Sequence, residues 1–317
     1  MQSKEKGNLL VVDDSELLLQ HIFKILKDEG YNLSVARNGH EAIACMKLSL
    51  PDLILLDVEM PKMDGWQTIH NLKSNKATSN IPIIFYTNHN NQKFEVKAFD
   101  RGAVDYIYKQ SADEVLKRRV KTHMTLSLQN KELHRFAFFD PLTGVSNRSG
   151  LERHLKTLWR TAQTSKEPMS VVLSDIDSFK SYNDAFGHPQ GDVALKTTGQ
   201  VLQQEVKRGG DMLARWGGEE FIMLLPQTHP EDAYKFAERS RQQIENAEID
   251  ILPGVKREVE VNGAIKKASK LTASFGVASH VLDRNSEFKD LVSEADAALY
   301  HAKNQGRNQV QFAPKER

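Results

Sequence analysis

Five short apolar runs alternate with amphipathic stretches along the first third of the chain. The runs lie at residues 9–12, 33–36, 53–56, 81–86 and 104–107. Apolar runs of this length, separated by helical patterns, are typical of buried strands joined by helical crossovers. The pattern therefore predicts a doubly wound α/β unit of five βα repeats around a parallel sheet.

Polar side chains follow these predicted strands. Asp13 and Asp14 come after the first strand, Asp57 after the third, Thr87 after the fourth and Lys109 shortly after the fifth. The carboxyl ends of the strands line the functional crevice in such folds, so three carboxylates should gather at one edge. A single Asp there is more often a turn or cap residue, but a cluster of three needs a cation. The arrangement indicates a Mg²⁺ site beside a nucleophilic carboxylate, for which Asp57 is the best candidate.

A continuous helix is predicted over residues 112–139, which contain neither Gly nor Pro. Seven positions in this stretch follow one another at alternating four- and three-residue spacing, as in a coiled-coil seam. Only four of the seven are apolar, so the seam would be weak, and a solvated spacer helix is the alternative. The seven are Val115, Arg119, Thr122, Leu126, Gln129, Leu133 and Phe136.

In the second half, Glu219 and Glu220 follow Gly217 and Gly218 and precede an apolar run at residues 221–225. Glycines let a phosphate approach the backbone, and glutamates supply the hard oxygens that suit Mg²⁺. The same residues would equally fit a plain β-hairpin with solvated glutamates. The rest of the second half must therefore decide between the two interpretations.

Three further residues favour a phosphate site. Asp175 follows a predicted strand at residues 169–173 and could meet Glu219 across a metal, as in phosphoryl and nucleotidyl transfer. Lys303 and Arg307 are four residues apart, so a helix would bring both cations to one polyphosphate. Each residue alone would usually be a solvated surface charge.

Composition limits the remaining possibilities. The 317 residues are enough for two cored domains, and 43 Lys and Arg balance 42 Asp and Glu. A formal charge of +1 argues against broad capture of nucleic acid or anionic membrane. The one cysteine, Cys45, excludes an intrachain disulfide. Without a signal-peptide core or an apolar run near the ~20 residues that span a bilayer, we expect a cytoplasmic protein.

Residues 7–123 resemble the receiver domain of two-component response regulators, because the acid pair, the central acid, the hydroxyl and the lysine occur in that family's order. The resemblance implies that a histidine kinase phosphorylates Asp57. It also implies that Asp14, Asp57 and the carbonyl of Glu59 bind one Mg²⁺, with Asp13 in support.

The same resemblance assigns a switch. Thr87 and Lys109 would contact the phosphoryl oxygens, and Tyr106 would be the aromatic residue whose rotation follows the Thr movement. Two departures from the family pattern are Asn88, where a small residue is usual, and Gln110, where proline is usual. These departures would alter the lifetime of the phosphoryl group or the coupling of the receiver to the second domain, but they leave the acceptor chemistry of Asp57 intact.

Nearly all of residues 140–313 resemble the GGDEF family of diguanylate cyclases, with the signature in its Gly-Gly-Glu-Glu-Phe form. The motifs lie at residues 140–148, 175–192, 215–221, 272–278 and 295–308. The resemblance implies an α+β fold like the palm of nucleotide cyclases, with an antiparallel sheet flanked by helices. It further implies the condensation of two GTP into cyclic di-GMP and two pyrophosphates.

Roles in this second domain follow residue by residue from the resemblance. Asp175, the carbonyl of Ile176 and Glu219 would hold two Mg²⁺, and Glu220 would assist. The terminal phosphates would be bound by a set comprising Phe179, Lys180, Lys303 and Arg307, beside Gly217 and Gly218. Lys180 is also counted with the catalytic residues.

Asn183 and Asp192 would read the guanine base. An aspartate accepts well from guanine N1–H and the exocyclic amine, so Asp192 argues for GTP over ATP. Each 3′-hydroxyl must attack the other nucleotide's α-phosphate, so two domains must face each other as a homodimer.

An inhibitory site is also predicted. Arg208 and Asp211 match the family's Arg-x-x-Asp motif at the expected distance before the Gly-Gly pair. Arg239 matches an arginine that a neighbouring domain contributes in related enzymes. Cyclic di-GMP would bind there as product and inhibitor, since Arg can fork onto guanine or phosphate.

The sequence therefore predicts a receiver domain at residues 1–123, a helical stalk at 124–139 and a cyclase domain at 140–317. The alternative is a catalytically silent cyclic di-GMP receptor or scaffold, against which Glu219 and Lys303 argue. A DNA-binding regulator lacks support because the second half shows no basic cluster and no compact helix-turn-helix. A cyclase for mixed dinucleotides would be expected to lack the acid at position 192. Phosphorylation could either create the dimer or rearrange an existing one.

Overall fold

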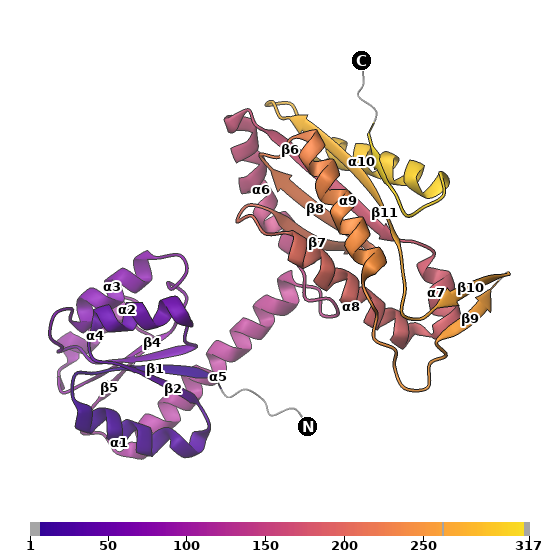
Figure 1. Cartoon of the computed structure of the whole chain (residues 1–317). Coiled ribbons are helices and arrows are strands. Elements are labelled where there is room, and N and C mark those ends of the chain that lie inside the picture. Colours follow the sequence, from indigo (N-terminus) through magenta and orange to yellow (C-terminus); the bar gives the residue numbers. More distant parts are fainter. Residues whose placement is uncertain (1–6, 262, 314–317) are drawn as a thin grey trace. The chain divides into compact units, whose positions relative to one another are not determined.

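The computed structural model describes residues 7–261 and 263–313 and divides the chain into two compact units, Met1–Leu133 and His134–Arg317 (Figure 1). Each unit has a five-stranded sheet covered by helices on both faces. The predicted fold class is confirmed for both halves of the chain.

The sheet of the first unit is entirely parallel, in the order β2-β1-β3-β4-β5. Each of the five predicted apolar runs contributes one strand. The fourth strand is displaced toward the C-terminus, so that Thr87 ends it instead of following it. The strands are β1 (Asn8–Val12), β2 (Asn32–Ala36), β3 (Leu53–Leu56), β4 (Ile83–Thr87) and β5 (Asp105–Tyr108).

Side chains with acceptor oxygens set the starts of the helices between these strands. Ser15, Asn38, Asp64 and Asn91 each accept a hydrogen bond from a backbone N–H in the first turn, which satisfies a donor that the helix leaves free. The helices are α1 (Glu16–Leu26), the 3₁₀ helix η1 (Lys27–Glu29), α2 (Gly39–Leu48), α3 (Gly65–Ser74) and α4 (Gln92–Asp100).

Two apolar layers enclose this sheet. One packs α1 and the first half of α5 (Asp113–Phe138) against the strands, and the other packs α2, α3 and α4 (Figure 1). The central strands β1, β3 and β4 are apolar and buried along nearly their whole length, as expected for a parallel sheet between helical layers. The polar residues that follow the strands are consequently gathered at the sheet's edge.

The helix α5 carries the predicted seam. Leu116, Val120 and Met124 face the first unit's core, and the helix continues beyond that unit's last residue, Leu133. All seven seam positions lie instead on the exposed side. Its four apolar members are 38%, 50%, 65% and 58% exposed, in the order Val115, Leu126, Leu133 and Phe136. An apolar stripe is thus present on the surface, and its pairing with a second copy stays a prediction.

The second unit has a mixed sheet in the order β12-β11-β6-β8-β7, with β11 and β12 parallel and the other pairs antiparallel. The antiparallel sheet implied by the resemblance is present, and one parallel strand, β12, extends it. The strands are β6 (Pro168–Ile176), β7 (Met212–Gly217), β8 (Glu220–Pro226), β11 (Ala273–Val281) and β12 (Val310–Phe312), with a separate hairpin of β9 (Glu258–Val261) and β10 (Ala264–Lys267).

Helices cover both faces of this sheet (Figure 1). Val172 and Ile176 of the central strand β6 point into the core formed with one helical layer, while Val171 and Leu173 point into the other. Asp175 continues the second set by alternation, so it faces the same layer as α10. The layers are α7 (Phe179–Phe186), α8 (His188–Glu205) and α9 (Pro230–Asn246) on one face, and α6 (Arg148–Ser165) and α10 (Phe288–Asn304) on the other.

Gly276 of β11 allows α10 to lie close to the sheet. A Cβ at this position would be 2.1 Å from the carbonyl oxygen of Ala295 and 2.3 Å from the backbone nitrogen of Leu299. Both neighbours are helix backbone, which cannot yield as a flexible side chain can. The glycine therefore determines how closely α10 packs against the sheet, and with it the position of Lys303 near the helix end.

We expect Gly276→Ala to lower the free energy of unfolding of the second unit by at least about 2 kcal/mol, because the added methyl overpacks the α10 contact. Urea unfolding of the full chain, followed by Trp159 and Trp216 fluorescence in a Trp66→Phe background, measures this. The matched control is Gly209→Ala, where no described atom lies within 4 Å of the new methyl. Equal midpoints for the two variants would contradict the packing account.

Candidate functional site

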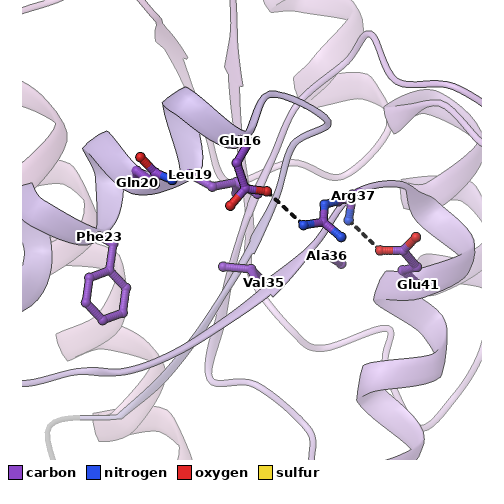
Figure 2. A pocket seen from close by; sticks show the side chains of 8 residues that line it. All are labelled: Glu16, Leu19, Gln20, Phe23, Val35, Ala36, Arg37 and Glu41. Carbon is purple, nitrogen blue, oxygen red and sulfur yellow. Dashed lines mark hydrogen bonds and ion pairs between the residues drawn. The ribbon is translucent and has the colours of Figure 1, made fainter.

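A hollow of about 230 Å³ between α1 and β2 contains none of the predicted site residues (Figure 2). Its polar groups already bind one another. The Arg37 guanidinium is 2.7 Å from a Glu16 carboxylate oxygen, and the Arg37 backbone N–H donates to Glu41 over 2.9 Å. The predicted phosphoacceptor site lies at the carboxyl ends of β1 and β3 instead.

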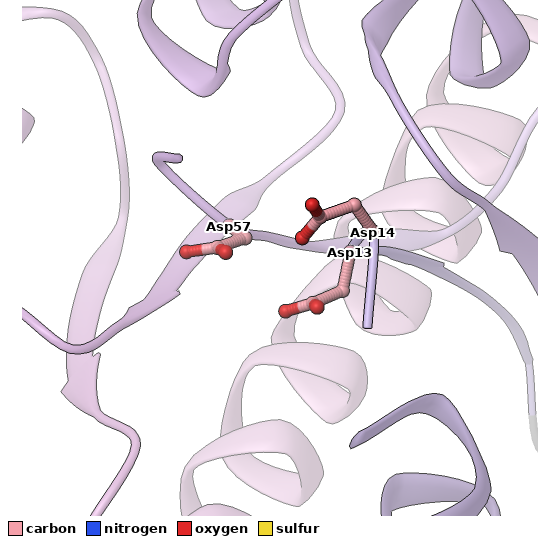
Figure 3. Close-up of side chains that lie close together, drawn as sticks. All are labelled: Asp13, Asp14 and Asp57. Atoms are coloured by element: carbon pink, nitrogen blue, oxygen red, sulfur yellow. The ribbon is translucent and has the colours of Figure 1, made fainter. Parts of the chain in front are cut away.

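Three aspartates meet at that edge (Figure 3). Asp13 and Asp14 follow β1 and Asp57 follows β3, and one oxygen from each lies within 4.8 Å of the others. Asp13 and Asp57 are buried, while Asp14 is exposed. This is the convergence that the sequence predicted, in the part of the chain that the structure describes.

One lysine offsets part of this charge. The Lys109 ammonium lies 2.6 Å from an oxygen of Asp13 and 2.8 Å from one of Asp57. Burial raises the pKa of Asp57, and Asp13 adds to the effect although Lys109 opposes it. Burial works against the charge on Lys109, but its two carboxylate partners outweigh burial and raise its pKa. A single positive charge against three carboxylates leaves a negative site that fits a divalent cation.

The predicted switch residues are connected through His89. Tyr106 is buried and its hydroxyl donates to the His89 carbonyl over 2.8 Å, while the His89 backbone N–H donates to the hydroxyl of the buried Thr87 over 3.4 Å. The His89 ring is 2.9 Å from a Glu59 carboxylate oxygen and stacks on Phe94. Only the Glu59 carbonyl was predicted to take part, so this side-chain link between the two loops was missed.

In the second unit, Asp175 is opposite Glu220 in the β6–β8 pairing, and its carboxylate is 2.7 Å from the Lys303 ammonium of α10. Burial raises the pKa of Asp175, with Glu219 adding to the shift and Lys303 opposing it. Burial, followed by Asp175, likewise raises the pKa of Glu220. Lys303 was predicted to bind phosphate, and in this structure it balances the charge of the predicted metal ligand.

The glycines form the tip of the β7–β8 hairpin. Gly217 pairs with Glu220, which leaves Gly218 and Glu219 as the loop, and Gly218 has a left-handed φ of 50°. No described atom lies within 4 Å of a Cβ added at Gly217 or Gly218. The space beside this turn is open, so a phosphate could approach its backbone.

An arginine anchors this hairpin. Arg215 donates to the Gly218 carbonyl over 2.8 Å and to both carboxylate oxygens of Asp140 over 3.1 Å. Burial opposes the charge of Asp140, but hydrogen bonds from Thr143 and Arg215 outweigh it and lower its pKa. The sequence placed Asp140 in a domain-start motif but did not reveal this contact, because the two residues are remote along the chain.

The predicted base-reading residues lie together between α7 and α8. An oxygen of Asn183 is buried without a hydrogen-bond partner among the described residues, and it packs so closely on Gly191 that a Cβ there would be 1.8 Å away. Asp192 follows Gly191 and is exposed. An unpaired buried oxygen beside an exposed carboxylate fits a ligand with hydrogen-bond donors. Phe179 and Lys180 begin α7, the first buried and the second exposed.

One geometric argument was wrong. Lys303 and Arg307 were expected on one face of a helix, but α10 ends at Asn304. Gly306 and Arg307 have positive φ values and leave the helical path, as glycine commonly does at a helix end. Arg307 is exposed and lies in the turn that follows the helix, so helical spacing does not relate it to Lys303.

Two of the three predicted inhibitory residues, Arg208 and Asp211, lie just before β7, and the third, Arg239, lies on α9. Arg208 is exposed and donates to the Thr228 hydroxyl over 3.2 Å, and its carbonyl accepts from the backbone N–H of Asp211. Burial raises the pKa of Asp211, which Arg208 opposes. Arg239 of α9 lies 3.3 Å from Glu205 at the end of α8 and stays exposed.

A cavity also borders the acidic site. It has a volume of about 380 Å³, and Glu220 lines it together with Trp216, Phe288 and Asp296. Burial and Asp175 raise the pKa of Glu220 most, Lys303 opposes them, and Asp296 adds a smaller upward shift. No role was predicted for Asp296, although it falls within the last matched motif.

Comparison with known proteins decides the family. The family model described as diguanylate cyclase, GGDEF domain, matches residues 137–309, which is more than half of the chain. The chain belongs to the GGDEF diguanylate cyclase family. The model of the response regulator receiver domain matches residues 9–121, so the chain joins a receiver domain to a GGDEF domain.

Individual relatives share this architecture in whole or in part. Response regulator PleD of Caulobacter vibrioides is 30% identical over 96% of this chain, which spans 65% of that relative's length. Diguanylate cyclase DgcM of Escherichia coli is 34% identical over 57% of this chain and 39% of its own. The crystal structure of the coiled coil and GGDEF domain of DgcB from Caulobacter crescentus, in complex with c-di-GMP, is 25% identical with a TM-score of 0.52, covering 64% of this chain and all of that one.

No helix of the described residues is both long enough and apolar enough to cross a bilayer.

Removal of Lys109 should leave the carboxylates of the receiver site without a neutralising positive charge. We expect Lys109→Ala to destabilise the first unit by about 3 kcal/mol, because it leaves the buried carboxylates of Asp13 and Asp57 without their positive partner. Amide hydrogen exchange of β1 and β3 in the full chain measures the loss. Millimolar Mg²⁺ should recover more stability in this variant than in the unmutated protein.

The control is Arg118→Ala, which removes an exposed pair with Glu114 and should change little. A Lys109→Ala protein as stable as this control, or one indifferent to Mg²⁺, would show that the three carboxylates do not form a cation site.

Proposed function

We propose that the protein is a phosphorylation-regulated diguanylate cyclase that condenses two GTP into cyclic di-GMP and two pyrophosphates. The observation that carries the proposal is the acidic group on the α10 face of the second sheet. Asp175 and Glu220 are paired neighbours on adjacent strands, Glu219 is at the hairpin tip, and Lys303 binds Asp175. Asp175 is buried and the two glutamates are partly exposed, so three carboxylates gather at an accessible site, which a receptor that only binds product would not need.

Mg²⁺ fits the donors at both sites. In the GGDEF unit Asp175, the Ile176 carbonyl and Glu219 would hold two ions with help from Glu220, and in the receiver Asp14, Asp57 and the Glu59 carbonyl would hold one. Bound Mg²⁺ supplies positive charge that activates a hydroxyl and stabilises a reacting phosphate. Lys303 would then be free to leave Asp175 and bind the terminal phosphates together with Arg307.

GTP is the expected substrate. The unpaired oxygen of Asn183 and the exposed carboxylate of Asp192 are both acceptors, and guanine offers donors at N1 and at its exocyclic amine. Adenine cannot present the same pair of donors. Phe179 and Lys180 would meet the phosphates at the start of α7, with Lys180 supporting the reaction.

Regulation requires a kinase and a second copy of the chain. A histidine kinase would phosphorylate Asp57, and the altered contacts of Lys109, Thr87 and Tyr106 would carry the change through the receiver. The exposed apolar stripe on α5 would pair two chains so that each GGDEF unit supplies one GTP. The crystal structure of the coiled coil and GGDEF domain of DgcB supports this arrangement, because it joins a coiled coil to a GGDEF domain.

Product inhibition would act through Arg208 and Asp211, with Arg239 supplied by a neighbouring domain. Arg208 is exposed and has one hydroxyl partner, so most of its donors remain available. The GGDEF domain of DgcB was crystallised in complex with c-di-GMP, which supports binding of this dinucleotide by the fold.

The enzymatic proposal predicts a product. Purified protein given GTP and Mg²⁺ should yield cyclic di-GMP by chromatography, and Asp175→Asn should lower the rate by more than about a hundredfold because one metal ligand loses its charge. Asp290→Asn, an exposed change on α10, is the charge-matched control and should keep the rate. No product from the unmutated protein, with tight binding of cyclic di-GMP, would instead favour the silent receptor.

Feedback inhibition has a separate prediction. Added cyclic di-GMP should slow the unmutated enzyme, and Arg208→Ala should raise the concentration for half inhibition about tenfold or more, because it removes a charged hydrogen-bond donor. Initial rates across a series of product concentrations give this value. Inhibition unchanged in the Arg208→Ala protein would remove the assignment.

A further inference from the structure

The turn that carries Arg307 has an unusual backbone. Gly306, Arg307 and Asn308 have φ values of 111°, 63° and 47°, so three successive residues lie in the left-handed region. Glycine enters this region freely and asparagine tolerates it, but arginine does so at a cost in free energy. Such a residue persists only where its surroundings fix it, and these cases concentrate at functional sites.

A buried aspartate fixes one side of the turn. The backbone N–H of Asn308 donates to Asp177 over 3.0 Å. The same carboxylate accepts from the Thr272 hydroxyl over 2.7 Å and from the Ser274 hydroxyl over 2.6 Å. Asp177 is 8% exposed and follows Asp175 by two residues, so it ties the turn to the strand that carries the proposed metal ligand.

The helix α9 fixes the other side. The Asn308 side chain accepts from Arg241 over 2.8 Å and donates to Glu245 over 2.9 Å. Arg241 is itself nearly buried, with 12% of its side chain exposed, and is held by ion pairs to Glu238 and Glu245. The turn is therefore fastened to two elements that are remote in sequence, through both the backbone and the side chain of one residue.

Arg307, in contrast, has no ion-pair partner among the residues that the structure describes, and it is exposed. A left-handed backbone that neighbouring residues maintain is found mainly at functional sites, and here it carries a guanidinium without an ion-pair partner among the described residues. We propose that Asp177, Asn308 and Arg241 are positioning residues, which hold Arg307 where it binds the terminal phosphates of GTP. This inference rests on the proposed cyclase function.

The test compares two nucleotides on the full chain with Mg²⁺. The first, 3′-deoxy-GTP, has the triphosphate but lacks the attacking hydroxyl, and the second, GMP, has the base without the terminal phosphates. Asn308→Gly keeps a residue that accepts the left-handed backbone but removes the bonds to Arg241 and Glu245. We expect it to weaken 3′-deoxy-GTP binding about tenfold and to leave GMP binding unchanged, because only the triphosphate reaches Arg307.

Arg307→Asn should weaken the triphosphate similarly while its unfolding midpoint stays equal or rises, since asparagine relieves the backbone. Asn285→Gly, at an exposed loop position, is the matched control and should change neither affinity. An equal loss for both nucleotides in Asn308→Gly, or no loss for either, would overturn the positioning role. Failure of the unmutated protein to bind 3′-deoxy-GTP would reject the cyclase function itself, and this inference with it.

Discussion

Buried aspartate at the carboxyl end of a strand, balanced by one lysine, is the arrangement on which both units depend. Lys109 binds Asp13 and Asp57 in the receiver, and Lys303 binds Asp175 in the GGDEF unit. Burial opposes ionisation of Asp57 and Asp175, and the lysine restores part of the balance. Each site still has more carboxylates than cations, so each is suited to Mg²⁺, whose positive charge would in turn attract a phosphate.

The remaining architecture places these charges. In the first unit, helical layers on both faces force the polar residues to the sheet's edge. In the second, Gly276 lets α10 lie close enough for Lys303 to reach β6, and Arg215 holds the Gly-Gly hairpin against Asp140. The apolar stripe on α5 is exposed and packs against neither core. Exposed apolar side chains of this kind are suited to contact with a second chain.

The fold and the principal acids could be predicted from the sequence because they depend on local pattern and on a topological rule. The apolar runs predicted the strand positions, and the rule that parallel strands end on the same side of a sheet predicted that Asp13, Asp14 and Asp57 lie together. Contacts between remote segments could not be predicted, such as Arg215 with Asp140 or Glu59 with His89. The four-residue spacing of Lys303 and Arg307 gave a wrong prediction, because it assumes a helix and α10 ends before Gly306. The role of Asp177 in holding the Arg307 turn could not be predicted, because nothing in the sequence marks this residue except its position two residues after Asp175.

The central claim is that the receiver's phosphoacceptor controls cyclase activity, and one rate comparison tests it most directly. Cyclic di-GMP formation from GTP and Mg²⁺ would be measured with and without beryllofluoride, which mimics a phosphoryl group on Asp57, in the unmutated protein and in Asp57→Asn. The account predicts a faster rate with beryllofluoride in the unmutated protein alone. An identical response in both proteins, or a cyclase rate that beryllofluoride does not change, would contradict it.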